Sequence, residues 1–283
     1  MFAATIGFFD GVHRGHRCLI DQLMALSAER NLETMIVTMR EHPRTVLQSD
    51  YIPRLLTTPD EKERLLRETG VNSVYFIPFN RNMASLTAAE FMEQILKPRG
   101  IRMLLMGYDH HFGHGKALFE DYVEWGRQCG IEVKRAHELE GLHVSSTAIR
   151  SLLVQGKIKD AEELLGHKYL LSGEVIEGHH IGRRIGFPTA NIKISTDKVL
   201  PCMGVYAVRT EYGLGMLDIG TRPTVNNGND MTVEVHLINF SGNLYGKSLT
   251  LELLTFIREE RTFESLDQLQ QQLEKDRNVV LSL

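Results

Sequence analysis

Cysteine is scarce in this sequence, and long apolar runs are absent. The 283 residues include three cysteines, which lie far apart at Cys18, Cys129 and Cys202. An odd number at such spacing argues against a disulfide framework and against a cysteine zinc site. The sequence has no run of about 18 apolar residues, the length that a membrane helix needs, and no charged segment followed by an apolar leader. We therefore expect a cytoplasmic protein with no membrane partner.

Excess positive charge is absent as well. The 36 aspartates and glutamates outnumber the 32 lysines and arginines, which gives a formal net charge of −4. Because there is no basic stripe either, we expect no nucleic-acid partner, although local basic loops can still hold small phosphates. Hydrophobic residues make up 42% and charged residues 24% of the chain, as in ordinary globular proteins. The length suits one large or two ordinary domains.

The first part of the chain alternates strand-like and helix-like segments. Short apolar or β-branched runs predict strands at 3–8, 34–39, 74–77, 103–106 and 132–134. An apolar stripe at 19–26 indicates a first helix, and capping boxes at Thr58/Glu61 and Thr87/Glu90 indicate two more. We expect the later helices at 58–70, 87–96 and 119–128. This order predicts a doubly wound parallel sheet, in which ligands bind beyond the carboxyl ends of the strands.

The pattern changes near residue 167, which we take as the boundary between domains at 1–167 and 168–283. Before it, residues 146–165 predict two short helices broken at Gly156. After it, strand-like runs follow one another at 169–177, 204–210, 214–219, 232–237 and 248–257. They predict an antiparallel barrel or sandwich, closed by one helix at 265–276 that starts with a capping box at Ser265/Gln268.

A phosphate site is predicted where the first strand passes into the first helix. The strand-like run contains Gly7, and the turn that follows places His13, Gly15 and His16 near a helix N-terminus. Backbone N–H groups and the helix dipole favour phosphate there. The alternative is that the two histidines only cap the helix. A metal site is less favoured, because the nearby sequence offers no third ligand.

Two further segments belong to the same half of the chain. Three histidines stand close together at His110, His111 and His114 and raise the alternative of a metal site, but their spacing matches no known zinc pattern. At 144–150, Ser145 or Ser146 can cap a helix, and Arg150 follows one turn on. Such a group suits an anion like pyrophosphate, and capping alone is the alternative.

A second phosphate site is predicted in the glycine-rich residues 178–191. Gly178, Gly182 and Gly186 recur every fourth position, with basic residues between them. Such a loop can wrap its free N–H groups around an anion. Thr189 and Asn191 supply oxygen, the ligand type that suits Mg²⁺. The alternative is a mobile glycine-rich hairpin.

The strand at 232–237 alternates in polarity, so that Glu234 and His236 share one face and three apolar residues share the other. A solvent-exposed edge is the alternative to a site here. Residues 242–248 look like a P-loop, but they are one residue short between the glycines. They also lead into a strand where a P-loop needs a helix, so we reject that interpretation.

These motifs resemble those of a known enzyme family. Residues 7–16, Gly-Phe-Phe-Asp-Gly-Val-His-Arg-Gly-His, resemble the opening of bacterial FAD synthetases, which more often have Asn in place of Phe8. Residues 182–191, Gly-Arg-Arg-Ile-Gly-Phe-Pro-Thr-Ala-Asn, resemble the signature of riboflavin kinases. Residues 107–113 resemble another motif of the first group, with His110 where Phe is usual. Over nearly its whole length the chain resembles the bacterial bifunctional riboflavin kinase/FMN adenylyltransferase family.

The resemblance implies an α/β domain followed by a β domain. The first is a Rossmann-like nucleotidylyltransferase domain at 1–167, and the second is an antiparallel β-barrel riboflavin kinase domain at 168–283. It implies two ATP-dependent steps: phosphorylation of riboflavin to FMN, and adenylylation of FMN to FAD with release of pyrophosphate. Mg²⁺ is expected with the ATP, and no tightly bound metal is expected. The oligomeric state is left open.

The resemblance also implies roles for individual residues. Catalysis is implied for His13, His16 and Arg150 in adenylyl transfer, and for Glu234 as the base that accepts the riboflavin hydroxyl proton. Binding of ATP or its phosphates is implied for Gly7, Asp10, Gly15, Asp109, Ser145, Ser146, Thr147, Gly182, Arg183, Gly186 and Thr189. Flavin binding is implied for His42, Pro43, Arg222 and Arg258, with residues 219–224 as a flap. Metal binding is implied for Thr189 and Asn191.

Two other classes stay open. One is an adenylate-forming or RNA-modifying enzyme whose barrel binds nucleic acid, and the net charge of −4 counts against it. The other is a non-catalytic flavin sensor descended from the enzyme. The presence of Glu234, Thr189 and Asn191 counts against that loss of activity.

Overall fold

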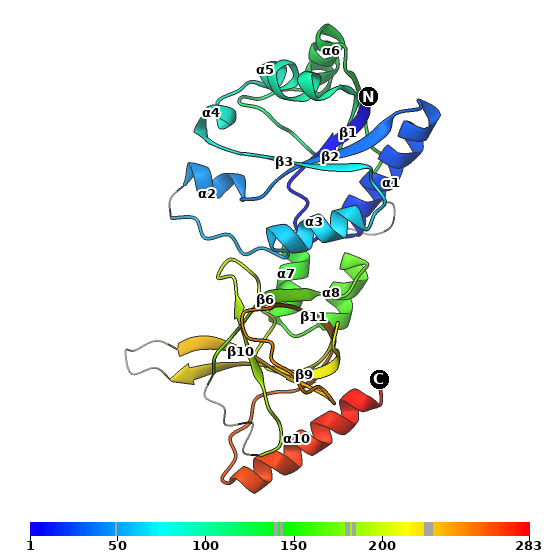
Figure 1. Cartoon of the computed structure of the whole chain (residues 1–283). Coiled ribbons are helices and arrows are strands. Elements are labelled where there is room, and N and C mark those ends of the chain that lie inside the picture. The colour runs from blue at the N-terminus through cyan, green and yellow to red at the C-terminus, as the bar shows by residue number, and fades with distance from the viewer. Residues whose placement is uncertain (49, 139–140, 142–143, 179–181, 183–184, 224–228) are drawn as a thin grey trace. The chain divides into compact units, whose positions relative to one another are not determined.

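The computed structural model describes residues 1–283 apart from 49, 139–140, 142–143, 179–181, 183–184 and 224–228. The side chains of residues 222, 223, 229 and 230 are likewise not described. The chain divides into two compact units, Met1–Ser146 and Thr147–Leu283 (Figure 1). Among the described residues, no helix is both long enough and apolar enough to cross a membrane.

A five-stranded parallel sheet forms the first unit, as predicted. The strands are β1 (Phe2–Ile6), β2 (Glu33–Met39), β3 (Ser73–Ile77), β4 (Ile101–Met106) and β5 (Glu132–Arg135). Their order is β3-β2-β1-β4-β5, and every neighbouring pair is parallel. The chain runs from β1 outward to β3 and then returns to the other side of β1. The strand order therefore reverses between β1 and β4, the place where doubly wound sheets bind ligands.

Helices connect these strands. They are α1 (Arg14–Glu29), α2 (Pro43–Leu47), α3 (Pro59–Arg67), α4 (Arg81–Ala84), α5 (Ala88–Phe91), the π-helical η1 (Met92–Leu96), the 3₁₀-helical η2 (Lys97–Arg99) and α6 (Phe119–Cys129). Of the three predicted capping boxes, those at Thr58/Glu61 and Thr87/Glu90 form. At the third, the Ser265 side chain accepts from the Gln268 N–H, whereas the Gln268 side chain accepts from the Glu264 N–H. Helices α2 and α4 were not predicted, because apolar periodicity needs a window longer than their five and four residues.

Side chains from alternate positions of the sheet enter two different cores. Ala4 and Leu104 belong to one buried cluster, whereas Ala3 and Met103 belong to another, which α1 completes with Leu23. Both faces of the sheet are therefore covered, as parallel sheets require. This burial explains why the strands appear in the sequence as short continuous apolar runs.

A closed antiparallel barrel forms most of the second unit, so a barrel rather than a sandwich is the correct form of the prediction. Its strands are β6 (Leu170–Ile176), β7 (Ala190–Ile194), β8 (Gly204–Thr210), β9 (Gly213–Pro223), β10 (Asn229–Leu237) and β11 (Ser248–Arg258). They close in the order β10-β7-β6-β11-β8-β9. Strand β7 was not predicted, because it is short and directly follows the glycine-rich residues. Strand β9 includes residues 219–223, most of the segment interpreted as a flap.

Helices lie at both ends of the second unit in sequence. Helices α7 (Ser146–Val154) and α8 (Ile158–Leu165) are separated at Gly156, as predicted, where φ is 73°. Residues from 147 onward group with the barrel, and the domain boundary at 167/168 stays a prediction. Helix α10 (Leu266–Leu281) continues beyond its predicted end because Val280 is fully buried in a cluster with Phe187.

Candidate active sites

The loop between β1 and α1 has an unusual backbone. Phe9, Gly11 and Val12 have positive φ angles of 54°, 82° and 42°. For a β-branched residue such as Val12 this conformation is strained, and surrounding contacts must hold it. The shape of the loop is therefore set by tertiary structure and not by local preference.

Residues at the start of α3 supply these contacts. The Asp10 carboxylate accepts hydrogen bonds through Oδ1 from the backbone N–H groups of Leu56 (2.8 Å) and Thr57 (3.2 Å). The Gly11 N–H donates to Thr57 Oγ1 at 3.1 Å. Asp10 is 4% exposed. Its carboxylate, which the resemblance assigned to ATP, thus also positions the loop.

Lys62 adds a charge beneath the same loop. Its side chain is almost fully buried, and Nζ donates to the carbonyl oxygens of Phe8 (3.1 Å) and Met39 (2.5 Å). The ammonium also lies 3.9 Å from the centroid of the Phe8 ring. Burial lowers the pKa of Lys62 to about 7, although the Asp10 carboxylate opposes this shift. Sequence reasoning missed Lys62, because nothing in the pattern of α3 marks it as buried.

His13 and His16 lie side by side at the start of α1. His13 caps the helix, and its Nδ1 accepts from the His16 N–H at 3.4 Å, so the capping alternative is part of the structure. The two rings are stacked with centroids 3.6 Å apart, and Gly15 lies between the residues in the first turn. Burial, then the neighbouring His13, Lys62 and His110, hold the pKa of His16 well below its usual value. His16 is therefore neutral at pH 7.

Other predicted residues of the first unit lie around the carboxyl ends of β1, β2 and β4. The Gly7 N–H donates to Val37 O at 3.1 Å, which fixes it at the end of β1. His42 caps α2, whose first residue is Pro43, and its ring meets the Phe8 ring edge-on at 4.8 Å. Asp109 is exposed in the segment after β4. Burial lowers the pKa of the adjacent His110 to about 4.

A serine at the end of the first unit is hydrogen-bonded to the same loop. Ser146 Oγ donates to the Asp10 carbonyl oxygen at 3.1 Å, across 136 positions of sequence. Ser145 directly precedes α7, whereas Thr147 and Arg150 lie in α7 and belong to the second unit. Among the described residues, no three His, Cys, Asp or Glu side chains form a metal-binding group, which leaves the histidine metal alternative without support.

In the second unit, five strands place one residue each in a continuous cross-strand row. The paired residues, in order around the barrel, are Asn191, Glu234, Asp218, Val205 and Arg258. Residues directly opposite each other in antiparallel strands point to the same face. Thr189, two positions before Asn191, donates through Oγ1 to Glu234 Oε2 at 3.1 Å. The predicted base and the predicted metal ligands thus lie together.

Two cavities meet at Thr189. One has a volume of about 340 Å³ and is lined by Glu234, Asp218 and Arg258 together with apolar side chains that include Phe187, Met216, Phe263, Leu269 and Leu273. The other has a volume of about 460 Å³ and is lined by Thr189, Val235 and residues 240–245. Because Glu234 and Val235 are neighbours in β10, they point to opposite faces of the strand.

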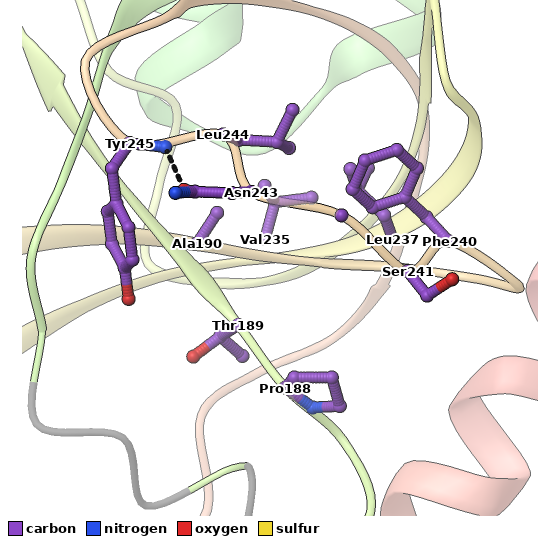
Figure 2. A pocket seen from close by; sticks show the side chains of 11 residues that line it. Pro188, Thr189, Ala190, Val235, Leu237, Phe240, Ser241, Asn243, Leu244 and Tyr245 are labelled. Atoms are coloured by element: carbon purple, nitrogen blue, oxygen red, sulfur yellow. Dashed lines mark hydrogen bonds between the residues drawn. The ribbon is translucent and has the colours of Figure 1, made fainter.

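The larger cavity is framed by the segment before β11. Figure 2 shows the rings of Phe240 and Tyr245 at opposite ends of this segment, and Thr189, which directly precedes β7, also lines the cavity. The Tyr245 N–H donates to Asn243 Oδ1 at 3.0 Å and fixes a turn. The strand β11 begins at Ser248, which agrees with the rejection of a P-loop here. The sequence analysis nevertheless missed that this segment lines a cavity.

Two other polar side chains of the smaller cavity are already engaged. His236 donates through Nδ1 to the Pro188 carbonyl oxygen at 2.8 Å, and burial lowers its pKa. Arg258 Nε lies 2.9 Å from Asp276 Oδ2, in a pair whose side chains are 11% and 2% exposed. Arg258, which was predicted to bind flavin, therefore lines the smaller cavity, and its guanidinium is bound to Asp276 of α10.

The predicted glycine-rich loop is only partly described. Gly182 accepts hydrogen bonds at its carbonyl from the N–H groups of Ile185 (3.3 Å) and Phe187 (2.9 Å), and a Cβ at Gly182 would lie 2.1 Å from Phe187 O. Only glycine fits this turn. Gly186 has a φ of 79°. Arg183 lies outside the described residues, as does the Arg222 side chain.

Comparisons with known proteins match both units. A family model described as FAD synthetase matches residues 1–148, and one described as riboflavin kinase matches residues 165–283. The bifunctional riboflavin kinase/FMN adenylyltransferase of Escherichia coli (strain K12) is 39% identical, over 96% of this chain and 89% of that protein. The protein of the same name from Bacillus subtilis (strain 168) is 32% identical with the same coverage. A crystal structure of a macrolide-efflux protein from Streptococcus pneumoniae has a TM-score of 0.85 and 31% identity, over 99% of this chain and 94% of that one.

Proposed function

The chain belongs to the family of bifunctional riboflavin kinases/FMN adenylyltransferases, and from this premise we propose how its residues divide the chemistry. The enzyme builds flavin cofactors. It phosphorylates riboflavin to FMN with ATP, and it adenylylates FMN with a second ATP to give FAD and pyrophosphate. We assign the adenylylation to the first unit and the phosphorylation to the second.

In the first unit, the FMN phosphate attacks the α-phosphorus of ATP, and no protein nucleophile is needed. Catalysis then consists of holding the groups in line and stabilising the developing negative charge. His13 and His16 donate hydrogen bonds to phosphate from the start of α1, where the helix dipole also favours an anion. We assign Ser146 to the leaving pyrophosphate; Arg150, to which the resemblance gave a role in the same step, belongs to the second unit. The hydrogen bond from Ser146 to the Asp10 carbonyl, in the loop between β1 and α1, supports this assignment for Ser146.

In the second unit, the observation that carries the proposal is the contact between Glu234 and Thr189 at the junction of two cavities. We place the flavin in the smaller cavity, whose apolar side chains suit a flat aromatic ring. We place ATP in the larger one, against residues 240–245. Glu234 then accepts the proton of the riboflavin hydroxyl as that oxygen attacks the γ-phosphorus.

The residues of this junction fit a magnesium ion that arrives with ATP. Mg²⁺ is usually bound by one or two protein oxygens together with substrate phosphates and waters. Thr189 and Asn191 supply such oxygens from the same face of one segment, and Thr189 lies beside the carboxylate of Glu234. When bound, the ion neutralises phosphate charge during transfer. Thr189 and Asn191 would hold it, and Glu234 stays available for the proton.

We further propose that both reactions take place in the cytoplasm, with ATP, riboflavin, FMN and FAD as ligands and without a nucleic-acid partner. Cys18, Cys129 and Cys202 are free thiols, as is usual in a reducing compartment.

The test is to incubate the purified protein with riboflavin, ATP and Mg²⁺ and to separate the flavins by chromatography. FMN should form first, and FAD should accumulate at its expense. FMN without FAD would contradict the assignment of the first unit. Binding of riboflavin without any turnover would support the flavin-sensor alternative instead.

A further inference from the structure

A second carboxyl group, that of Asp218, shares the smaller cavity with Glu234. Asp218 lies on β9 directly opposite Glu234 on β10, and both line the cavity. Directly paired residues of an antiparallel ladder have Cβ atoms about 4.5–5.5 Å apart and point to the same face. The Asp218 carboxyl makes no hydrogen bond with any described residue.

The groups that face Asp218 are mostly acidic. Glu234 faces it from β10, Asp276 from α10 and Glu260 from the segment after β11. The Glu260 carboxylate lies against Gly220, two positions after Asp218 in β9, because a Cβ on Gly220 would be 2.0 Å from Glu260 Oε1. One nearby cation, Arg258, is bound to Asp276. Arg261 lines the same cavity. Close carboxylates in a partly buried site disfavour one another's ionisation, so a carboxyl among them can have a raised pKa.

The Asp218 carboxyl has such a raised pKa, although it is still mostly ionised at pH 7. Burial and the Glu260 carboxylate raise the pKa of Asp218 to about 6, against the opposing effect of Arg258. A protonated carboxyl both donates and accepts hydrogen bonds, and an ionised one accepts. In either state Asp218 is a polar group in the cavity that a hydroxyl-bearing substrate can satisfy.

The order of the strands gives the site a direction. Asn191 on β7 comes first, Glu234 on β10 second and Asp218 on β9 third. Neighbouring strands lie about 4.8 Å apart. With the phosphates beside Asn191 and the reacting hydroxyl beside Glu234, the next position along the row lies beside the inner hydroxyls of the flavin side chain.

Resting on the proposed kinase function, we propose that Asp218 is a substrate-binding residue of the kinase site. Its carboxyl hydrogen-bonds an inner hydroxyl of the ribityl chain, and this bond holds the terminal hydroxyl at Glu234. The site would therefore select flavins with a polyhydroxylated chain over flavins with a plain alkyl chain.

The experiment measures KM and kcat for the phosphorylation of two flavins. One is riboflavin, and the other carries a plain hydroxypentyl side chain. The second flavin keeps the terminal hydroxyl and lacks the inner ones. The proteins are the full-length wild type, Asp218→Ala, Asp218→Asn and the control Glu211→Gln, which alters an exposed carboxylate in the turn between β8 and β9.

We expect Asp218→Ala to raise KM for riboflavin by about 10-fold with little change in kcat, because the bond is made equally in ground and transition states. Asp218→Asn should stay within about 3-fold of wild type, since an amide also donates and accepts. With the hydroxypentyl flavin, wild type and Asp218→Ala should be alike, and the control should match wild type with both flavins.

Equal losses with both flavins, or an unchanged KM for riboflavin, would overturn the proposal. So would a wild-type enzyme that uses the two flavins equally well, a result that does not depend on whether any variant folds. A wild type that phosphorylates neither flavin would instead refute the kinase function itself.

Discussion

Removing the Arg258 guanidinium is expected to destabilise the second unit and to weaken riboflavin binding together. Arg258 Nε and Nη2 each lie 2.9 Å from Asp276 Oδ2, and the other carboxylate oxygen of Asp276 accepts from Gln272 at 2.7 Å. Asp276 is 1% exposed. Removing one partner of a buried ion pair leaves the other charge uncompensated and costs about 3–5 kcal/mol. In a unit of this size, each kcal/mol lowers Tm by roughly 2–4 °C.

The link to riboflavin is structural. Helix α10 carries Asp276, and it also contributes Leu269 and Leu273 to the cavity assigned to flavin. Arg258→Ala should therefore lower Tm by roughly 6–20 °C and raise KM for riboflavin. Thermal unfolding and initial-rate kinetics on the same preparation give both values.

A double variant separates this role from direct flavin binding. Arg258→Met with Asp276→Leu removes both charges, and replacing a buried ion pair by apolar residues is often neutral or stabilising. If Arg258 acts by holding α10, the double variant should recover both Tm and KM. Recovery of Tm without recovery of KM would mean that Arg258 contacts the flavin, as the family resemblance implied. A loss below about 1 kcal/mol in Arg258→Ala would refute the buried-pair argument.

Three further predictions concern the two activities and the buried lysine. His16→Ala should reduce FAD formation from FMN by about 10²-fold or more, through loss of one transition-state hydrogen bond, while FMN formation stays near wild type; undiminished FAD output would remove His16 from the mechanism. Glu234→Gln should reduce FMN formation by roughly 10²–10⁴-fold and leave FMN adenylylation intact; normal phosphorylation would make Glu234 structural. The pKa of Lys62 falls from 10.5 in the unfolded chain to about 7 in the folded chain. The unfolded chain therefore binds this proton more tightly, and the contribution of Lys62 to the free energy of unfolding should rise between about pH 7 and pH 10.5. When Tm is measured against pH, this rise should be absent from Lys62→Met. Identical profiles for Lys62→Met and wild type would show that folding does not lower the pKa of Lys62.

The boundary between the activities gives one more prediction. A fragment from Lys168 to Leu283 should fold and phosphorylate riboflavin without making FAD, because the adenylyl-transfer motifs are absent from it. A matched fragment that begins at Thr147 keeps α7 and α8, which group with the barrel. Cooperative unfolding and FMN production would be compared for the two. A folded shorter fragment that makes no FMN, beside an active longer one, would place the boundary before α7.

Most of the element types, and the chemistry of each half, could be predicted from the sequence alone. Continuous apolar runs predicted buried parallel strands, because such strands are covered on both faces. The Thr58 and Thr87 capping boxes predicted their helices, because those hydrogen bonds are local. The alternation around Glu234 likewise depends on neighbours in sequence, because successive side chains of a strand point to opposite faces.

The burial and pairing of several site residues depend on residues far apart in the chain, and these features are known only from the tertiary structure. Lys62 is buried only because the ends of β1 and β2 direct carbonyl oxygens at it, and Asp10 is engaged by residues more than 40 positions away. Asp218 lies beside Glu234 because of the register between β9 and β10. Arg258 forms an ion pair with Asp276 of α10, which is 18 positions away in sequence. Register, burial and long-range pairing are properties of the assembled barrel and sheet, and no local pattern encodes them.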